Sequence, residues 1–204
     1  MFWYEDEVKE LERKAFPKKT KKKRVVFYGS SSLRLWDTIQ NDFPEFQVIN
    51  QSFGGSTLAS CCWFFERLIP KTKPDILILY AGDNDLGDNR HPEEVYFYFV
   101  SMIELIKENF DELPVAFISV KNSPSRKYLE GSINYTNKII AELIEQKYPQ
   151  CTFIDINQSM LLNNQPNPEL FEPDGLHLSK AGYAVWKKEI KNNYLSRFLI
   201  ANTK

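Results

Sequence analysis

An aspartate and a histidine lie three residues apart near the C-terminus, in the turn-forming segment Pro173 to Ser179. At this spacing the carboxylate of Asp174 can accept a hydrogen bond from one ring nitrogen of His177 while the other nitrogen takes a proton from a nucleophile. The chain has only two histidines. The second, His91, precedes Pro92 and is expected to cap a helix that starts at that proline. His177 is therefore the better candidate for a general base.

Three consecutive serines, Ser30 to Ser32, follow Gly29 and the apolar run of residues 25–28. A serine at the tight turn between a strand and a helix has an exposed hydroxyl, and the N–H groups of the helix N-terminus can stabilise an oxyanion. Serines in such turns also act simply as helix N-caps. The pattern of a phosphate-binding loop, Gly-x-x-x-x-Gly-Lys-Ser/Thr, is absent. This segment could thus hold a nucleophile or merely cap a helix.

Two further polar segments follow apolar runs. The first contains the glycine pair Gly54-Gly55, which can turn sharply and bring a backbone N–H close to a ligand, although such pairs often form plain turns. The second contains Asn84, whose amide can donate to an oxyanion without changing its protonation state. Its neighbours Asp83 and Asp85 could instead cap a turn or bind a metal.

The elements that must position these segments alternate regularly along the chain. Short apolar runs predict five strands, and stretches with apolar residues at spacings of three and four predict five helices between them. The strands are expected at residues 25–28, 47–50, 76–80, 115–118 and 152–156, and the helices at 33–41, 58–69, 92–110, 133–147 and 180–198. This order predicts a three-layer α/β/α sandwich. Ligands bind such sheets at the carboxyl ends of the strands, where the polar segments begin.

In the order Ser, Gly, Asn and Asp-x-x-His, these four segments resemble the SGNH hydrolase superfamily, also called GDSL esterases and lipases, from Val25 to the last helix. The resemblance implies that Ser31 is the nucleophile and that Asp174 and His177 complete a triad. It implies an oxyanion hole made by the N–H groups of Ser31 and Gly55 and the side chain of Asn84. It also implies a flavodoxin-like parallel sheet with strand order 2-1-3-4-5.

The chain departs from the family pattern in two places. The usual Gly-Asp-Ser-Leu motif reads Gly-Ser-Ser-Ser here, a form that belongs to a serine-rich subgroup. Where the second motif often has an earlier glycine, this chain has Ser52. The segment Ser123 to Arg126 also resembles that subgroup. Arg126 could contact an anionic or hydroxyl-rich substrate, or it could be an exposed loop arginine without a role.

The length of 204 residues and a hydrophobic content of 43% predict one domain. Residues 1–23 are expected to form an N-terminal extension. It should contain a helix, because Val8, Leu11 and Ala15 fall on one side of a charged segment. A basic run from Lys18 to Arg24 follows this helix. We interpret it as a solvated approach to the first strand rather than a localisation signal or a polyanion site.

A formal net charge of -1 gives no general reason to bind nucleic acid. The sequence contains no run of about 18 apolar residues, which argues against a membrane span. Residues Met1 to Glu10 lack the apolar region of a secretory signal. Cys61, Cys62 and Cys151 fit neither a disulfide framework nor zinc-ligand spacing, which favours a reducing, cytoplasmic setting. The expected partner is a small-molecule ester, with no cofactor and no metal, and the oligomeric state is left open.

The function expected from these residues is hydrolysis of a carboxylic ester through an acyl-enzyme intermediate. An O-acetylated carbohydrate, a lysophospholipid and a thioester would all suit this chemistry. Two other classes stay open: a non-catalytic binding protein that keeps the pocket, and a metal-dependent hydrolase that uses Asp83, Asp85 and His177.

The segments after the strands are short or polar, and none is an apolar insertion large enough to cover a long acyl chain. Even the longest, residues 157–173, is rich in asparagine and is expected to form a turn exposed to water. We therefore predict an open, shallow site that prefers acetyl or butyryl esters. The alternative is an apolar groove formed by helical aromatic residues such as Phe64, Phe65 or Tyr96.

Overall fold

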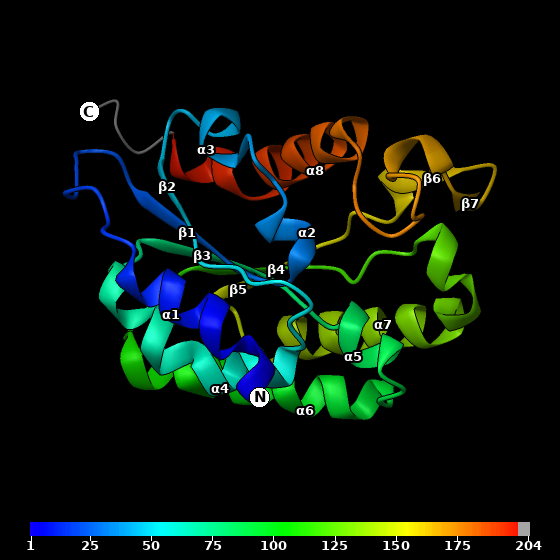
Figure 1. The fold of residues 1–204 in the computed structure, drawn as a ribbon, viewed down its shortest axis with the longest axis horizontal. Helices are drawn as coiled ribbons and strands as arrows, with labels where there is room; N and C mark the ends of the chain where they lie inside the picture. Colours follow the sequence, from blue (N-terminus) through cyan, green and yellow to red (C-terminus); the bar gives the residue numbers. More distant parts are fainter. Residues whose placement is uncertain (200–204) are drawn as a thin grey trace.

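A single parallel sheet organises the computed structural model, which describes residues 1–199. Its five strands lie in the order β2-β1-β3-β4-β5, with helices on both faces (Figure 1). The predicted sandwich and strand order are therefore confirmed. The strands are β1 (Arg24–Gly29), β2 (Gln47–Asn50), β3 (Ile76–Tyr80), β4 (Val115–Ile118) and β5 (Cys151–Ile154).

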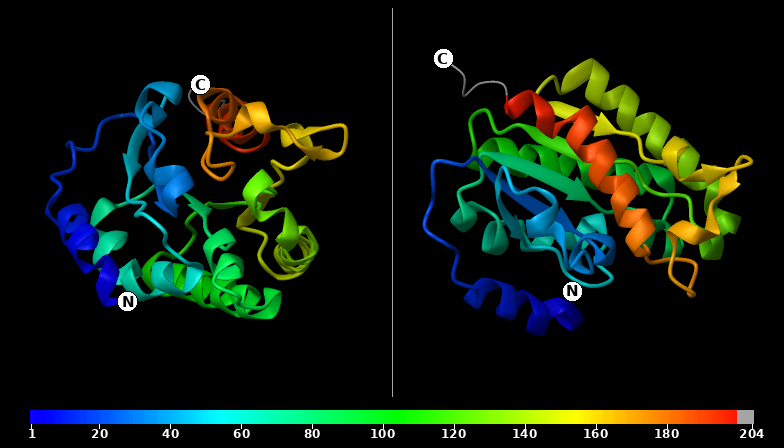
Figure 2. Two further views of the ribbon diagram at one scale, coloured as in Figure 1. Left: turned by 45° about the vertical axis from the view of Figure 1, so that its right-hand side comes forward. Right: turned by 90° about the horizontal axis from the view of Figure 1, so that it is seen from above.

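Helices cover the sheet on both sides and bury two apolar clusters against it (Figures 1 and 2). One face carries α1 (Glu5–Arg13), α4 (Leu58–Leu68), α6 (Pro92–Asn109) and α7 (Glu130–Lys147). The other face carries α2 (Ser31–Arg34), α3 (Ile39–Asp42) and α8 (Lys180–Asn193). A short helix, α5 (Asp83–Gly87), follows β3, and a small hairpin joins β6 (Leu161–Leu162) to β7 (Gln165–Pro166). Within residues 1–199, no helix is both long and apolar enough to cross a membrane.

The central strands are apolar because both of their faces are covered. Every residue of β1 and β3 is buried, and the two strands pair in parallel from Val25 opposite Ile76 to Gly29 opposite Tyr80. Gly29 closes β1 with φ +148°, and a Cβ atom there would lie 1.8 Å from the carbonyl oxygen of Tyr80. Only glycine fits this close approach. It lets the chain leave the sheet directly into the serine segment.

Three predicted helices differ from the observed ones. The stretch 33–41 forms α2 and α3 with a tight turn between them, because the chain bends at Trp36 to bury its indole beside Phe27 and Phe43. The last helix ends at Asn193, and residues 195–198 form a separate 3₁₀ turn. Helix α7 starts three residues before the predicted position. Helix α5 and the β6–β7 hairpin lack a long apolar periodicity, and the sequence analysis missed both.

The N-terminal extension contains the predicted helix, α1, which buries Val8 and Leu11. Ala15 lies beyond the helix and is exposed, contrary to the prediction. The interpretation of the basic run is also wrong at its last residue, because Arg24 is only 5% exposed. The Arg24 guanidinium donates to the Gln47 side chain and to two backbone carbonyl groups. The acceptors are the Gln47 side chain and the carbonyl groups of Thr72 and Pro17, of which the first two come from distant parts of the chain, and together they make burial of the charge possible.

Candidate active site

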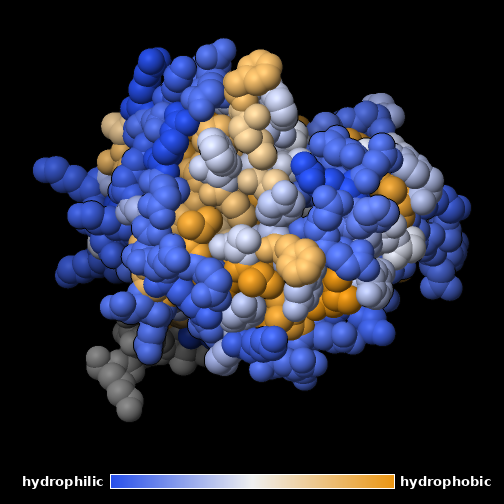
Figure 3. All heavy atoms as spheres, turned by 90° about the horizontal axis from the view of Figure 1, so that it is seen from below, coloured by the Kyte–Doolittle hydropathy of each residue, from blue (hydrophilic) through white to orange (hydrophobic). Residues whose placement is uncertain are grey.

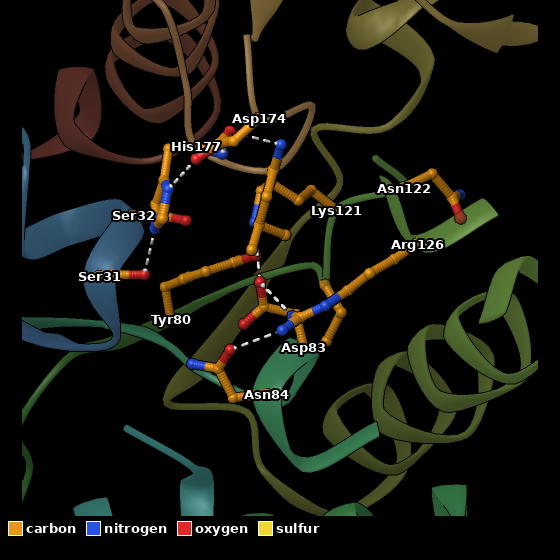
Figure 4. A network of polar contacts seen from close by, with 12 residues as sticks. Ser31, Ser32, Tyr80, Asp83, Asn84, Lys121, Asn122, Arg126, Asp174 and His177 are labelled. Atoms are coloured by element: carbon orange, nitrogen blue, oxygen red, sulfur yellow. Dashed lines mark hydrogen bonds and ion pairs between the residues drawn. The ribbon is translucent and has the colours of Figure 1, made fainter. Parts of the chain in front are cut away.

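Three of the predicted site residues meet above the carboxyl ends of the strands (Figure 4). His177 Nδ1 lies 2.6 Å from Asp174 Oδ2, and His177 Nε2 lies 3.1 Å from Ser31 Oγ. Ser31 begins α2 just after β1, whereas the other two residues belong to the loop before α8. A hydroxyl, an imidazole and a carboxylate in this chain of hydrogen bonds have the geometry of a nucleophile, its base and the group that orients the base.

Burial distinguishes Ser31 from its two neighbours. Ser30 and Ser32 are fully buried, while Ser31 is partly exposed. Ser30 is the N-cap residue of α2, and Ser31 is the first residue of this helix. Of the three hydroxyl groups, that of Ser31 is therefore both within reach of His177 and accessible from outside.

The loop before α8 holds the carboxylate of Asp174 in place. Its Oδ1 atom accepts hydrogen bonds from the N–H groups of Leu176, at 2.8 Å, and His177, at 2.9 Å. The hydrogen bond from the Leu176 N–H is the largest cause of a shift in the Asp174 pKa. Burial opposes it, but the hydrogen bonds from the side chain and N–H of His177 add to it, and the pKa falls to about 2. The group is therefore ionised at neutral pH and can accept a hydrogen bond from the Nδ1–H group of the imidazole.

Two backbone N–H groups of the predicted oxyanion hole are free to donate. In the part of the chain that the structure describes, the N–H groups of Ser31 and Gly55 have no hydrogen-bond partner. Gly55 has φ +66°, and a Cβ atom added there would meet nothing within 4 Å. Its conformation therefore favours glycine for backbone reasons, and its outer side is open to a ligand. Both N–H groups belong to the segments that the sequence analysis assigned to an oxyanion hole.

The side chain of Asn84 supplies a third donor. Its Nδ2 atom donates to the carbonyl oxygen of Ser56 at 3.1 Å, and an amide nitrogen carries a second hydrogen that this bond does not use. Figure 4 shows the amide oxygen turned toward Arg126 and the amide nitrogen turned away from it, on the side of Ser31. This is the orientation that a donor to an oxyanion requires.

Arg126 lies behind Asn84 and holds its amide oxygen. Its Nη2 atom donates to Asn84 Oδ1 at 2.9 Å, and its Nη1 atom lies 3.2 Å from Asp83 Oδ2. The side chain is 16% exposed. The sequence analysis considered Arg126 for substrate binding or for no role. The structure pairs its guanidinium with two side chains of α5, and contact with a substrate stays a prediction.

Arg126 belongs to a buried network of charged groups that the sequence analysis missed. Lys121 is 1% exposed and donates to Asp83 Oδ2 at 2.7 Å and to the Tyr80 hydroxyl at 3.1 Å. Burial alone would raise the pKa of Asp83, but the charges of Lys121 and Arg126 outweigh it, and the net shift of this pKa is downward. The only signal in the sequence was a lysine placed three residues after the end of β4.

The acidic residues of α5 contact different partners and do not converge on His177. Asp83 is paired with two cations, and Asp85 Oδ2 accepts the N–H of Leu58 at 2.8 Å. Across residues 1–199, no three side chains of the metal-binding types lie together in a group that could hold a metal ion.

The three cysteines carry free thiols. Burial raises the pKa of Cys62 and of Cys151 to about 12, and it also raises that of Cys61. The thiol groups are therefore protonated and weakly nucleophilic at neutral pH. This agrees with the choice of a serine as the candidate nucleophile.

A hollow of about 520 Å³ borders His177 on the side of α8. Its walls combine Leu35 and Tyr183 with the polar residues Thr38, Glu172 and Lys180. The aromatic groove considered from the sequence is not formed by Phe64 or Phe65, because α4 turns both rings fully into the core. Tyr96 is only partly buried and packs against the same core.

Comparison with known proteins agrees with this geometry. The model of the GDSL-like lipase/acylhydrolase family matches residues 27–185. None of the curated proteins compared with the chain matches it significantly. Among solved structures, a proposed acylhydrolase from Bacteroides fragilis is 26% identical, with a TM-score of 0.76 over 95% of this chain and 94% of that one.

Two other solved structures share the fold. A GDSL-like lipase from Bacteroides thetaiotaomicron is 25% identical, with a TM-score of 0.76 over 93% of this chain and 96% of that one. An acetyl xylan esterase is 17% identical, with a TM-score of 0.71 over 84% of this chain and 99% of that one. At this lower identity the likeness concerns the fold alone.

Proposed function

This chain belongs to the GDSL-like lipase/acylhydrolase family, and from that premise we propose that it is a serine esterase that hydrolyses carboxylic esters through an acyl-enzyme on Ser31. One observation carries the proposal: Ser31 Oγ lies 3.1 Å from the ring nitrogen of a histidine whose other ring nitrogen is bonded to an ionised aspartate. The pairing with Asp174 keeps a hydrogen on Nδ1 of His177, so that Nε2 can accept the serine proton.

Acylation uses the three side chains in sequence. The Oγ atom of Ser31 attacks the ester carbonyl carbon while Nε2 of His177 takes the hydroxyl proton. The bond from the carbonyl carbon to the alcohol oxygen then breaks, and His177 gives its proton to that oxygen. The alcohol leaves, and the acyl group stays on Ser31. Asp174 stabilises the positive charge that His177 carries between the two proton transfers.

Deacylation repeats the same steps with water. His177 takes a proton from a water molecule as the water oxygen attacks the acyl carbon. The bond to Ser31 Oγ breaks, and the proton returns to Oγ, which releases the carboxylic acid and restores the enzyme. In both steps the negative charge on the carbonyl oxygen meets the N–H groups of Ser31 and Gly55 and the amide of Asn84.

We propose short acyl groups, such as acetyl, on a carbohydrate or another polar alcohol as the substrate class. The segment after β5 supports a site without a lid, because Met160 is buried and accepts a hydrogen bond from Trp186 of α8 at 3.2 Å. Asn163 and Asn164 then turn the chain back in a hairpin. The hollow beside His177 carries the polar side chains of Thr38, Glu172 and Lys180 among apolar ones, and these can hydrogen-bond to the hydroxyl groups of an alcohol. An acetyl xylan esterase has the same fold, which is compatible with this proposal. We also propose that the protein works in a reducing compartment such as the cytoplasm, which the free thiols of its three cysteines support.

Specificity constants on p-nitrophenyl acetate, butyrate, octanoate and palmitate test the proposal. We expect the highest value for acetate or butyrate. Each methylene that a site buries contributes about 0.8 kcal/mol, and Glu172, Lys180 and Lys187 interrupt the apolar walls of the hollow beside His177. A maximum at octanoate or longer would favour a lysophospholipase instead. The same series with thioesters tests the thioesterase alternative.

Labelling with a fluorophosphonate separates an enzyme from a binding protein. The native chain should be labelled once, at Ser31, because only an activated serine reacts. Ser31→Ala provides the matched control and should stay unlabelled. A native chain that resists the probe and hydrolyses none of the esters would leave the binding protein as the remaining candidate. A chelator should leave ester hydrolysis unchanged. Loss of hydrolysis on addition of the chelator would instead favour the metal-dependent alternative.

A further inference from the structure

Two side chains near the N-terminus contact the loop that carries the proposed donor Gly55. The Tyr4 hydroxyl donates to the carbonyl oxygen of Gly55 at 3.0 Å, and Glu7 Oε2 accepts the N–H of Gly54 at 2.9 Å. The peptide unit between Gly54 and Gly55 carries the N–H group assigned to the oxyanion hole. The peptide units on both sides of it are therefore each held by a side chain from the first seven residues.

Tyr4 is held in this position by aromatic packing. It is 9% exposed, and its ring lies edge-on to Phe53 at 5.3 Å and to Phe64 at 6.3 Å between centroids. Its neighbours Phe2 and Trp3 are 82% and 65% exposed. Figure 3, which views the molecule from below relative to Figure 1, shows a face on which apolar side chains lie among charged ones. Of these three aromatic residues, Tyr4 alone turns inward and reaches the loop with its hydroxyl.

Glu7 links the loop to the helix that begins with Ser31. Its Oε1 atom lies 3.4 Å from Nε of Arg34, at the last position of α2, while Oε2 holds Gly54. The two carboxylate oxygens thus connect the two segments that supply backbone donors to the proposed oxyanion hole. Both side chains are partly exposed, so the ion pair by itself contributes little stability.

Other contacts dock α1 without touching the loop. Arg67 on α4 pairs with Glu5 at 2.8 Å and with Glu12 at 2.8 Å. The helix thus has an anchor of its own, and neither Tyr4 nor Glu7 takes part in it. This separation allows the contacts to the loop to be removed while the helix stays docked.

We propose that α1 and the turn before it position the oxyanion hole. Tyr4 and Glu7 hold the peptide units on both sides of the Gly54–Gly55 peptide, so that the N–H group of this peptide faces the reacting carbonyl. A glycine pair is flexible, and rotation of that peptide would turn the donor away. The inference rests on the proposed esterase function. Tyr4 and Glu7 also lie outside residues 27–185, which the family model matches, so the device belongs to this chain's extension.

The test measures kcat and KM of Tyr4→Phe and Glu7→Ala on p-nitrophenyl acetate. The concentration of active sites, by which the maximal rate is divided to give kcat, is determined by fluorophosphonate labelling to completion. Tyr4→Phe keeps the ring packing and removes only the hydroxyl. We expect kcat to fall about 10-fold in each variant, less than for loss of a donor itself, with KM within about 2-fold of native. The rate of fluorophosphonate inactivation should fall in parallel, because its tetrahedral adduct also places an oxygen in the hole.

Matched controls separate positioning from stability. Tyr148→Phe removes a hydroxyl at a distant site, and Glu10→Ala removes an exposed carboxylate from the same helix. Both should keep native kcat. A native kcat in Tyr4→Phe and Glu7→Ala would overturn the inference. This holds also if the melting temperature falls or KM changes while kcat stays native, because the side chains would then affect stability or binding alone. Failure of the esterase proposal is seen separately, as native protein without ester hydrolysis or Ser31→Ala with full activity.

Discussion

Arg126 donates a hydrogen bond to the amide oxygen of Asn84 at 2.9 Å, and together with the bond from the Asn84 amide nitrogen to Ser56 this contact favours the orientation in which the nitrogen faces the side of Ser31. A carboxamide can flip, and only its nitrogen can stabilise an oxyanion. Arg126→Ala should therefore lower kcat by about 10-fold while KM stays near the native value. Steady-state kinetics on p-nitrophenyl acetate measure both constants.

Substrate binding by Arg126 would give the opposite pattern. If the guanidinium contacts the substrate in the ground state, KM should rise and kcat should change little. Arg126→Lys is a useful second variant. It keeps the positive charge beside Asp83 but loses the fork of donors that contacts both Asp83 and Asn84.

The three adjacent serines should differ sharply in their contribution to catalysis. Ser31→Ala should lower turnover by about 10⁴-fold or more, because it removes the proposed nucleophile. Ser30→Ala and Ser32→Ala should leave measurable activity, since both hydroxyl groups are buried away from solvent. An inactive Ser30→Ala variant that still folds would show that the proposed nucleophile is the wrong serine.

Asn84 should act on the transition state rather than on substrate binding. The charge that its amide meets exists only in the tetrahedral intermediate, so Asn84→Ala should lower kcat by about 10² to 10³-fold, roughly 3 to 4 kcal/mol, with little change in KM. Asn41→Ala, at an exposed position of α3, serves as a control. Normal turnover in Asn84→Ala would remove this residue from the oxyanion hole.

Asp85 should make the stability of the protein depend on pH. Burial is the largest cause that raises its pKa from 3.8 to about 6. Between pH 3.8 and about 6, the Asp85 carboxyl therefore keeps its proton in the folded state, whereas it has lost this proton in the unfolded state. The stability that this proton contributes is fully present below pH 3.8 and is lost as the pH rises through about 6. The total effect is roughly 3 kcal/mol.

Urea unfolding of native protein and Asp85→Asn at several pH values between 3.5 and about 7 measures this effect. The asparagine cannot ionise, so the free energy of unfolding of Asp85→Asn relative to native should rise across this range. Asp111→Asn, at an exposed position, should show no such trend. A difference between Asp85→Asn and native that is the same at every pH would contradict the prediction.

The strands and the candidate triad could be predicted because their signals are local. The strands β2, β3 and β4 begin and end at the predicted residues, since a strand buried on both faces is a short apolar run between polar segments. His91 caps α6 at Pro92 as expected, because proline fits the first turn of a helix. Ser31, Asp174 and His177 were identified by motif order, and their catalytic roles stay predictions for the experiments above.

Contacts between distant segments had no such signal. The break between α2 and α3 depends on where the indole of Trp36 packs, and the burial of Arg24 depends on carbonyl groups that the fold brings to it. Likewise, nothing local relates Arg126 to Asn84, or Tyr4 to Gly55, which is 51 residues away.

The sequence alone therefore determined the positions of the strands, the apolar core and the residues able to do chemistry, because burial and turn preferences act over a few neighbouring residues. The strand order came from the resemblance to a known family. The tertiary structure decided which polar groups meet and how the donors of the site are aimed. A buried charge or amide takes the partners that the fold places within hydrogen-bonding distance, and for Lys121 these are Tyr80 and Asp83, about forty positions earlier in the chain.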